Sequence, residues 1–95
     1  MSEVYKALAE PARRRILELL REREMSAGEI AEHFKFSKPT LSGHLNVLRA
    51  AGLVQSERSG TTITYRLNIT VLEEALMALF DAFRLNAAAK PGDRK

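Results

Sequence analysis

The chain has 95 residues, a length that allows one small domain and excludes a second, catalytic domain. Hydrophobic residues make up 45% of it and charged residues 28%, with only 3 prolines, as in a folded domain that dissolves in water. There is no cysteine, which excludes a disulfide framework, thiolate zinc sites, iron–sulfur clusters and thiol redox chemistry. Because so small a domain buries only about 60 to 65% of its unfolded surface, we expect it to form a dimer.

The net charge of +3 is unevenly distributed along the chain. Residues 35–66 hold 5 basic and 1 acidic side chains, whereas residues 1–34 hold 6 and 7 and residues 67–95 hold 4 and 4. A local basic excess is typical of a surface that binds phosphates, although a modest excess also occurs on a surface that contacts only water. Charged residues also interrupt the N-terminal segment, and no run approaches the ~20 apolar residues of a membrane span. We therefore expect a cytoplasmic protein without membrane insertion.

The first part of the chain is predicted to form two helices. Apolar side chains within residues 4–8 indicate a short first helix. A second helix begins at Pro11, because proline is favoured in the first turn, and ends near Arg23. Among the arginines at residues 13–15, Arg14 and Arg15 can pair with Glu18 and neighbouring acids on the same helix, so we interpret this run as mainly structural.

Two more helices are predicted before residue 53. Ser26 and Glu29 match a capping box, in which each side chain bonds a backbone N–H group at the start of a short third helix. Ser37 followed by Pro39 is another start signal, and Gly52 is suited to the left-handed position that ends the fourth helix. Two short helices joined by about three residues indicate a helix-turn-helix.

The remaining elements are a β-hairpin and a last helix. From Leu53 the hydrophobic period changes to two, and a turn at residues 59–61 precedes the β-branched and aromatic run at residues 62–67. Residues 70–73 match a capping box that opens a last helix, which ends near Leu85. The sequence thus predicts a mainly α-helical winged helix-turn-helix with a small β-hairpin wing, in the order ααααββα.

Residues 1–86 are expected to form this one domain, and residues 87–95, rich in small and charged residues, a flexible C-terminal tail.

The last predicted helix has more apolar surface than one domain needs. One stripe is expected to be buried on its own domain: Leu72, Leu76, Leu79, Phe80 and Phe83. A second, mostly small surface consists of Val71, Ala78, Ala82 and Leu85. The thin core and the wide apolar helix together favour a subunit contact over the alternative, a helix that only covers its own core.

No catalytic residues are expected. Ser42 and His44 are two positions apart on a helix, about 200° around it, so they cannot form a nucleophile–base pair. Glu73 and Glu74 diverge in a similar way, and there is no phosphate-binding glycine loop and no His-Glu-x-x-His motif. The sequence therefore predicts a protein that is not an enzyme.

The fourth helix has a face suited to DNA. With Leu41, Leu45 and Leu48 turned inward, the opposite face is small and polar, and no acidic residue lies between positions 39 and 51. This face holds Pro39, Gly43, Asn46 and Ala50, flanked by Lys38, Thr40, Ser42 and Arg49. Small residues allow close approach to a major groove, while amide, hydroxyl and ammonium groups bond base edges and phosphates. An ordinary solvated face, the alternative, usually carries long acidic residues.

The hairpin adds Arg58 beside the turn, where a guanidinium suits a backbone or minor-groove contact, or is merely exposed.

Two segments, residues 10–20 and 37–54, resemble the ArsR-type winged-helix repressors. The second contains the run Ser-x-x-x-x-Ser-x-His-Leu-x-x-Leu leading into Gly-Leu-Val. Residues 25–34 and 68–72 are most similar to the SdpR-like autorepressor branch of that family.

The resemblance implies a homodimer that places two recognition helices in successive major grooves of near-palindromic double-stranded DNA. The implied DNA-binding residues are Ser37, Lys38, Pro39, Thr40, Ser42, Gly43, His44, Asn46, Arg58 and Thr61. The implied dimer residues, on the first and last helices, are Val4, Tyr5, Leu8, Val71, Ala75, Ala78, Leu79, Ala82 and Phe83. Gly43 departs from the family, since many members carry Arg or His there.

Metal-sensing members use a cysteine in the third helix or acid and His pairs on the last helix. Here Ala27, Ile30 and Ala31 occupy the first region, and residues 68–95 contain no histidine. The two histidines, His33 and His44, lack a metal-ligand spacing. We expect no metal and no cofactor, and an autorepressor without a metal or thiol switch. The alternatives are a winged-helix module that binds another protein, and a repressor gated by a small-molecule or protein anti-repressor that the sequence does not identify.

Overall fold

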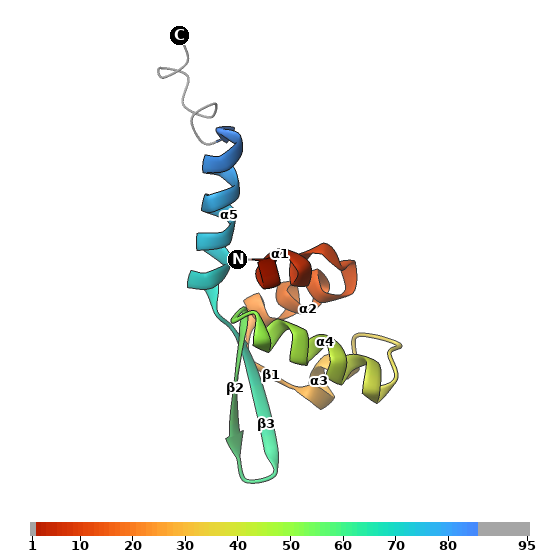
Figure 1. Cartoon of the computed structure of the whole chain (residues 1–95). Helices are drawn as coiled ribbons and strands as arrows, with labels where there is room; N and C mark the ends of the chain where they lie inside the picture. The colour runs from red at the N-terminus through yellow and green to blue at the C-terminus, as the bar shows by residue number, and fades with distance from the viewer. Residues whose placement is uncertain (1, 86–95) are drawn as a thin grey trace.

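The computed structural model of the chain describes residues 2–85, so the tail expected at residues 87–95 lies outside the described part. Its helices are α1 (Ser2–Ala9), α2 (Pro11–Glu22), α3 (Ala27–Ala31), α4 (Lys38–Ala50) and α5 (Ile69–Phe83), and its strands are β1 (Met25–Ser26), β2 (Val54–Ser59) and β3 (Thr62–Leu67). Helices α1 to α4 form a body from which the β2–β3 hairpin and α5 extend in opposite directions (Figure 1). The predicted mainly α-helical winged helix-turn-helix is confirmed.

The core lies where α2, α3 and α4 meet the start of the hairpin. Its largest fully buried side chains are Ile16, Ile30, Leu48, Leu53 and Val54. The inward face predicted for α4 is confirmed, since Leu41 and Leu45 are buried beside Leu48. The opposite face of α4 is thereby fixed toward the outside of the body.

Local hydrogen bonds define the ends of α3 and α4 as the sequence predicts. The Ser26 N–H group donates to Glu29 Oε1 at 2.9 Å, and the Glu29 N–H group donates to Ser26 Oγ at 3.1 Å, which completes the capping box of α3. Ser37 Oγ accepts from the Thr40 N–H group at 3.3 Å at the start of α4. Gly52, with a φ of 80°, provides the left-handed turn after α4.

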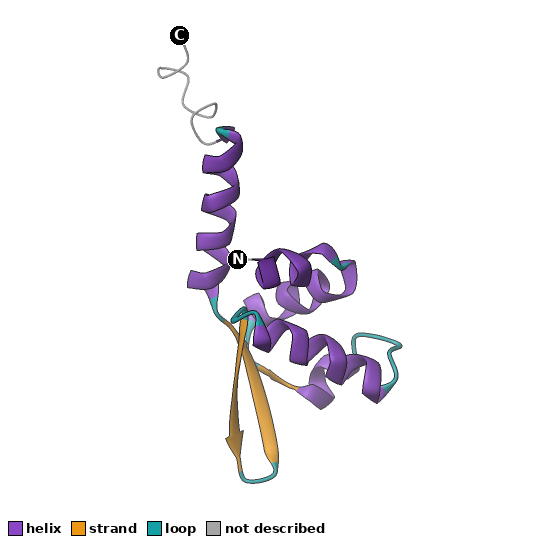
Figure 2. Cartoon of the chain, in the orientation of Figure 1, coloured by secondary structure: helices purple, strands orange, loops and turns teal. Residues whose placement is uncertain are grey.

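Strand β1, of 2 residues, was not predicted from the sequence, and it makes the sheet three-stranded (Figure 2). Met25 pairs with Tyr65 and Ser26 with Thr64, so the sheet order is β1-β3-β2 and all pairs are antiparallel. So short a segment has no period of its own and becomes a strand only because β3 lies beside it. The strand joins the base of the wing to the start of α3.

Two expectations about the last helix need correction. Helix α5 is capped by Asn68, whose Oδ1 accepts from the Val71 N–H group at 3.4 Å, and not by Thr70. The predicted apolar stripe is buried only in part: Leu72 and Leu79 are half-buried, whereas Leu76 is 39% exposed and Phe83 69%. The rest of the stripe is left uncovered because α5 extends beyond the helical body (Figure 1).

Candidate nucleic-acid interface

The exposed face of α4 brings together most of the predicted DNA-binding residues. All of the following are exposed: Lys38, Pro39, Thr40, Ser42, Gly43 and Asn46. A Cβ atom added at Gly43 would meet nothing within 4 Å, so glycine is not needed there for packing. At this position the helix backbone itself is open to close approach by a ligand.

Ser37 has a structural role at the start of this face. Besides capping α4, its Oγ donates a hydrogen bond to Thr40 Oγ1 at 3.0 Å. The two hydroxyl groups therefore bond to each other and keep the first turn of α4 in place, next to Lys38.

His44 is set apart from the other predicted DNA-binding residues. It is half-buried, and its Nδ1 lies 3.3 Å from Nη1 of Arg13 on α2. Phe36 also packs against His44, with ring centroids 5.2 Å apart, and the Phe36 ring is stacked on that of Phe34 at 4.6 Å. Since a guanidinium only donates, Nδ1 is the acceptor in this hydrogen bond.

Arg13 connects three helices. Its Nε donates to the Ala7 carbonyl at 3.0 Å and its Nη2 to the Lys6 carbonyl at 3.1 Å, while Nη1 reaches His44. The neighbouring Arg14 donates to the Leu8 carbonyl at 2.8 Å, and Arg15 lies 3.9 Å from Glu18. Of the two arginines predicted to pair with acidic neighbours, Arg15 does so. Arg14, like Arg13, instead donates to the free carbonyls at the end of α1.

The wing places Arg58 on β2 and Thr61 in the turn, both exposed. Gly60, with a φ of 64°, allows the tight reversal between them. Two polar contacts stabilise the wing: Arg49 Nη1 donates to Ser56 Oγ at 3.2 Å, and Arg66 lies 3.4 Å from Glu57. The first contact joins the end of α4 to β2, so the wing and the exposed face of α4 are held next to each other.

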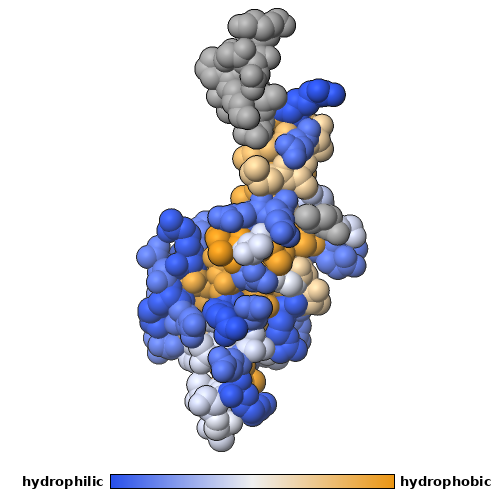
Figure 3. Space-filling view, turned by 90° about the vertical axis from the view of Figure 1, so that its left-hand side faces the viewer, coloured by the Kyte–Doolittle hydropathy of each residue, from blue (hydrophilic) through white to orange (hydrophobic). Residues whose placement is uncertain are grey.

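The predicted dimer residues differ in their exposure. Val4 and Ala75 are 7% and 0% exposed, so they are already covered by their own chain. Half-buried positions are Tyr5, Leu8, Val71 and Leu79, and exposed positions are Ala78, Ala82 and Phe83. A groove of about 370 Å³ between the helical body and α5 is lined mainly by leucines from α1, α2, β3 and α5. Apolar side chains gather on this side and continue along α5 (Figure 3).

Within residues 2–85, no group of three or more His, Cys, Asp or Glu side chains lies close enough together to hold a metal ion. None of the helices in the same described range is long and apolar enough to span a membrane.

Comparison with known proteins places this geometry in a family. Residues 10–56 match the family described as "Bacterial regulatory protein, arsR family". The chain is 49% identical over 76 residues to the transcriptional repressor SdpR of Bacillus subtilis, covering 80% of this chain and 84% of that protein. It is 40% identical over 73 residues to the arsenical resistance operon repressor of Staphylococcus xylosus, covering 77% of this chain and 70% of that protein.

The fold also matches a solved structure, the homodimeric winged helix-turn-helix DNA-binding domain of Mb0332 from Mycobacterium bovis. The TM-score is 0.70 at 32% identity, covering 90% of this chain and 82% of that one. A helix-turn-helix with an exposed, polar second helix and an adjacent wing defines a DNA-binding transcriptional regulator, not an enzyme. The chain belongs to the arsR family of bacterial regulatory proteins and is a transcriptional repressor of this class.

Proposed function

We propose that the chain is an autorepressor that binds a near-palindromic operator as a homodimer, with α4 of each protomer in a major groove. The observation that carries this proposal is the exposed face of α4, which holds Pro39, Gly43 and Asn46 and lacks any acidic side chain. A helix whose outer face is this small can lie deep in the groove, where the amide of Asn46 can bond a base edge. Similarity to SdpR supports the repressor role, and we expect it to act in the cytoplasm, where the operator is.

The uncovered surface of α5 supports the proposed homodimer. Exposed apolar side chains of this size are unfavourable in water, and pairing with a second copy would bury them. The homodimeric relative from Mycobacterium bovis supports this assembly. Two recognition helices related by a two-fold axis would then read two half-sites about one helical turn apart.

We further propose that repression needs no metal or thiol switch. The chain contains no cysteine, and its two histidines lie apart: His33 follows α3 and is exposed, whereas His44 is held by Arg13. Among residues 2–85, neither belongs to a group of three or more potential metal ligands.

A gel-shift titration of promoter fragments at several salt concentrations tests the proposal. The wild type should bind one palindromic fragment with strong salt dependence, and Lys38→Ala combined with Arg58→Ala should weaken binding and reduce the salt slope by about 2 per protomer. Arg15→Ala combined with Arg21→Ala removes the same charge from exposed positions on α2 and serves as the control. Unchanged affinity and slope in the first double variant would contradict the assigned surface and favour a protein partner instead.

A further inference from the structure

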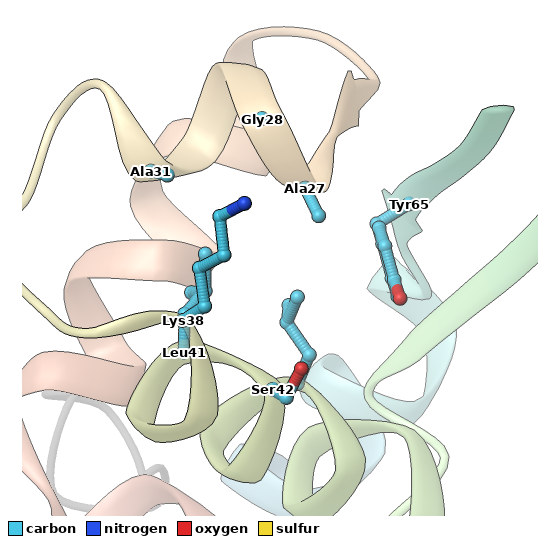
Figure 4. A pocket seen from close by; sticks show the side chains of 8 residues that line it. Ala27, Gly28, Ala31, Lys38, Leu41, Ser42 and Tyr65 are labelled. Carbon is cyan, nitrogen blue, oxygen red and sulfur yellow. The ribbon is translucent and has the colours of Figure 1, made fainter.

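A hollow of about 330 Å³ lies between α3, α4 and β3, next to the exposed face of α4 (Figure 4). Its walls are formed by Ala27, Gly28, Ala31, Lys38, Leu41, Ser42, Leu45 and Tyr65. Tyr65 belongs to the wing strand β3 and is not among the residues that the sequence marks for DNA binding. The hollow is therefore formed by both the helix-turn-helix and the wing, and only the tertiary structure places Tyr65 in it.

Three hydrogen-bond donors reach this hollow: the Lys38 ammonium, the Ser42 hydroxyl and the Tyr65 hydroxyl (Figure 4). In the part of the chain from residue 2 to residue 85, none of these groups bonds to another residue. They are thus free to bond a ligand. The rest of the wall is apolar, made of alanine and leucine side chains.

A second hollow, of about 460 Å³, continues the first toward the wing turn and shares four lining residues with it. The shared residues are Ala27, Gly28, Ser42 and Tyr65. The second hollow adds Ser26, Thr61, Thr62 and Ile63. The two together form one trough, here called the α3–wing trough, which runs from Lys38 to the wing turn.

The charge of the α3–wing trough favours an anionic occupant. Of the residues that the structure describes, 2–85, none with a carboxylate lines either hollow. Glu29, next to Gly28, directs its carboxylate to the Ser26 N–H group and to Arg23, whose Nη1 lies 3.2 Å away. That carboxylate lines neither hollow, and its charge is paired with that of Arg23.

We propose that the α3–wing trough holds the sugar-phosphate backbone of one operator strand, with the Tyr65 hydroxyl as a phosphate donor; this inference rests on the proposed DNA-binding function. A deoxyribose-phosphate chain combines apolar sugars with anionic phosphates, which matches alanine walls beside free donors. An isolated small anion would leave the apolar wall uncovered. In a helix-turn-helix the first helix crosses the DNA backbone while the second enters the groove, and the trough lies between these two helices.

The residues of α4 would then have two roles, contact with phosphates and contact with bases. At about 100° per residue, Lys38 and Ser42 lie on the flank of α4 that faces α3 and β3, while Pro39, Gly43 and Asn46 face outward. The flank contacts phosphates and sets affinity, whereas the outward face reads bases and sets specificity. Lys38 and Ser42 are thereby assigned to the backbone.

Two substitutions test the trough at positions that the sequence did not predict to bind DNA. Tyr65→Phe removes one hydroxyl and keeps the ring that packs on the core, and Gly28→Glu places a carboxylate in the trough at an exposed position where a Cβ meets only Ser26 Oγ at 3.8 Å. Gln55→Glu, on β2, makes the same charge change outside the trough and is the control. Thermal unfolding establishes first that each variant folds as the wild type does.

Binding is then measured on the operator and on a scrambled duplex. Tyr65→Phe should weaken both by about tenfold for each protomer, because a hydrogen bond to a charged phosphate is lost and phosphates carry no sequence information. Gly28→Glu should weaken both more strongly, and Gln55→Glu should change neither by more than about twofold.

A scan with single methylphosphonate substitutions in the operator locates the contact. One neutralised phosphate per half-site should weaken the wild type but have no further effect on Tyr65→Phe. If Tyr65→Phe and Gly28→Glu bind as the wild type does while Asn46→Ala, outside the trough, still weakens operator binding, the trough is not the backbone site, although the proposed function survives. If the wild type binds no DNA, the proposed function itself fails.

Discussion

At the scale of single residues, the half-buried His44 packs against other parts of the chain, unlike the exposed residues of the same motif on α4. The histidine lies on the recognition helix, but its contacts are with Arg13 and Phe36 at the back of that helix. Since Arg13 also bonds two carbonyls at the end of α1, one guanidinium fixes α4 relative to α1 and α2.

Replacing Arg13 should therefore affect both stability and DNA binding. Arg13→Gln loses up to three hydrogen bonds, and we expect a loss of about 2 kcal/mol in the free energy of unfolding together with weaker operator binding. Arg14→Gln, which loses the single bond to Leu8, should cost at most about 1 kcal/mol and leave DNA binding unchanged. Urea denaturation and gel shifts measure both effects. Equal behaviour of the two variants would show that the contact with His44 has no positioning role.

Asn46 is expected to determine specificity, because it lies on the outward face of α4. Asn46→Ala should cost about 1 to 3 kcal/mol on the preferred operator and relax the choice of base at one position per half-site. Selection of binding sites from a random DNA pool, with wild type and variant in parallel, gives the base preference. An unchanged preference at every position would mean that Asn46 does not contact a base.

At the scale of elements, the start of α3 has a pH dependence that can be worked out from its capping box. The Ser26 N–H group and, second, Arg23 hold the pKa of the Glu29 carboxyl below its ordinary value. A carboxyl with a lowered pKa in the folded state stabilises the fold above its unfolded pKa and loses that contribution as the pH falls through the folded pKa.

We therefore expect Glu29→Gln to be less stable than the wild type at neutral pH and to approach it in acid. Thermal unfolding from pH 7 down into the range where carboxylates protonate should show the two melting curves converging. Glu32→Gln, an exposed carboxylate one turn later, is the matched control and should not reproduce the effect. A constant gap between wild type and Glu29→Gln across the range would contradict the role of the charge.

At the scale of the whole molecule, α5 is the element that one chain cannot bury. Its exposed large apolar residues are Ile69, Leu76, Met77, Phe80 and Phe83, with Leu85 just beyond its end. The small residues Ala78 and Ala82 are also exposed and lie on the surface predicted to meet a partner. Ala75, by contrast, is fully buried in its own chain, so changing it would test folding rather than assembly.

A charge on the small apolar surface of α5 around Ala78 and Ala82 should dissociate the proposed dimer. Ala78→Glu or Ala82→Glu would bury an unpaired carboxylate, at a cost of about 3 to 5 kcal/mol. Light scattering at micromolar concentration should then show a monomer, and operator binding should collapse although every DNA-facing residue is intact. Thr70→Glu, on the polar side of α5, adds the same charge and should stay dimeric. A monomeric wild type, or charged variants that remain dimeric and bind DNA normally, would show that this surface of α5 is not the dimer interface.

Metal ions should leave the repressor unaffected. Zinc, arsenite or copper should not change operator affinity, because there is no thiolate and the two histidines form no recognisable site. Elemental analysis of the purified protein and metal titration in the gel shift measure this. Stoichiometric, tightly bound zinc that is lost in His33→Ala, together with derepression, would overturn the prediction.

The sequence by itself determined the features that depend on neighbours in the chain. The capping box at Ser26, the start of α4 at Ser37, the left-handed turn at Gly52 and the inward leucines of α4 all follow from hydrogen bonds and periods a few residues long. These signals are local, and together with the motif around α4 they were enough to predict the fold class and the family.

Tertiary structure alone decided what distant segments do to one another. The contact of Arg13 with His44 joins residues 31 positions apart. The pairing of Met25 with Tyr65, and the place of Tyr65 beside α3 and α4 in the trough, also join distant segments, and no local pattern marks them. The same holds for α5, where the apolar stripe predicts that one face is buried but does not predict which part of the molecule covers it. Because hydrophobic burial is non-directional, periodicity shows which face of a helix avoids water, and only the three-dimensional arrangement shows that the helical body leaves this face uncovered.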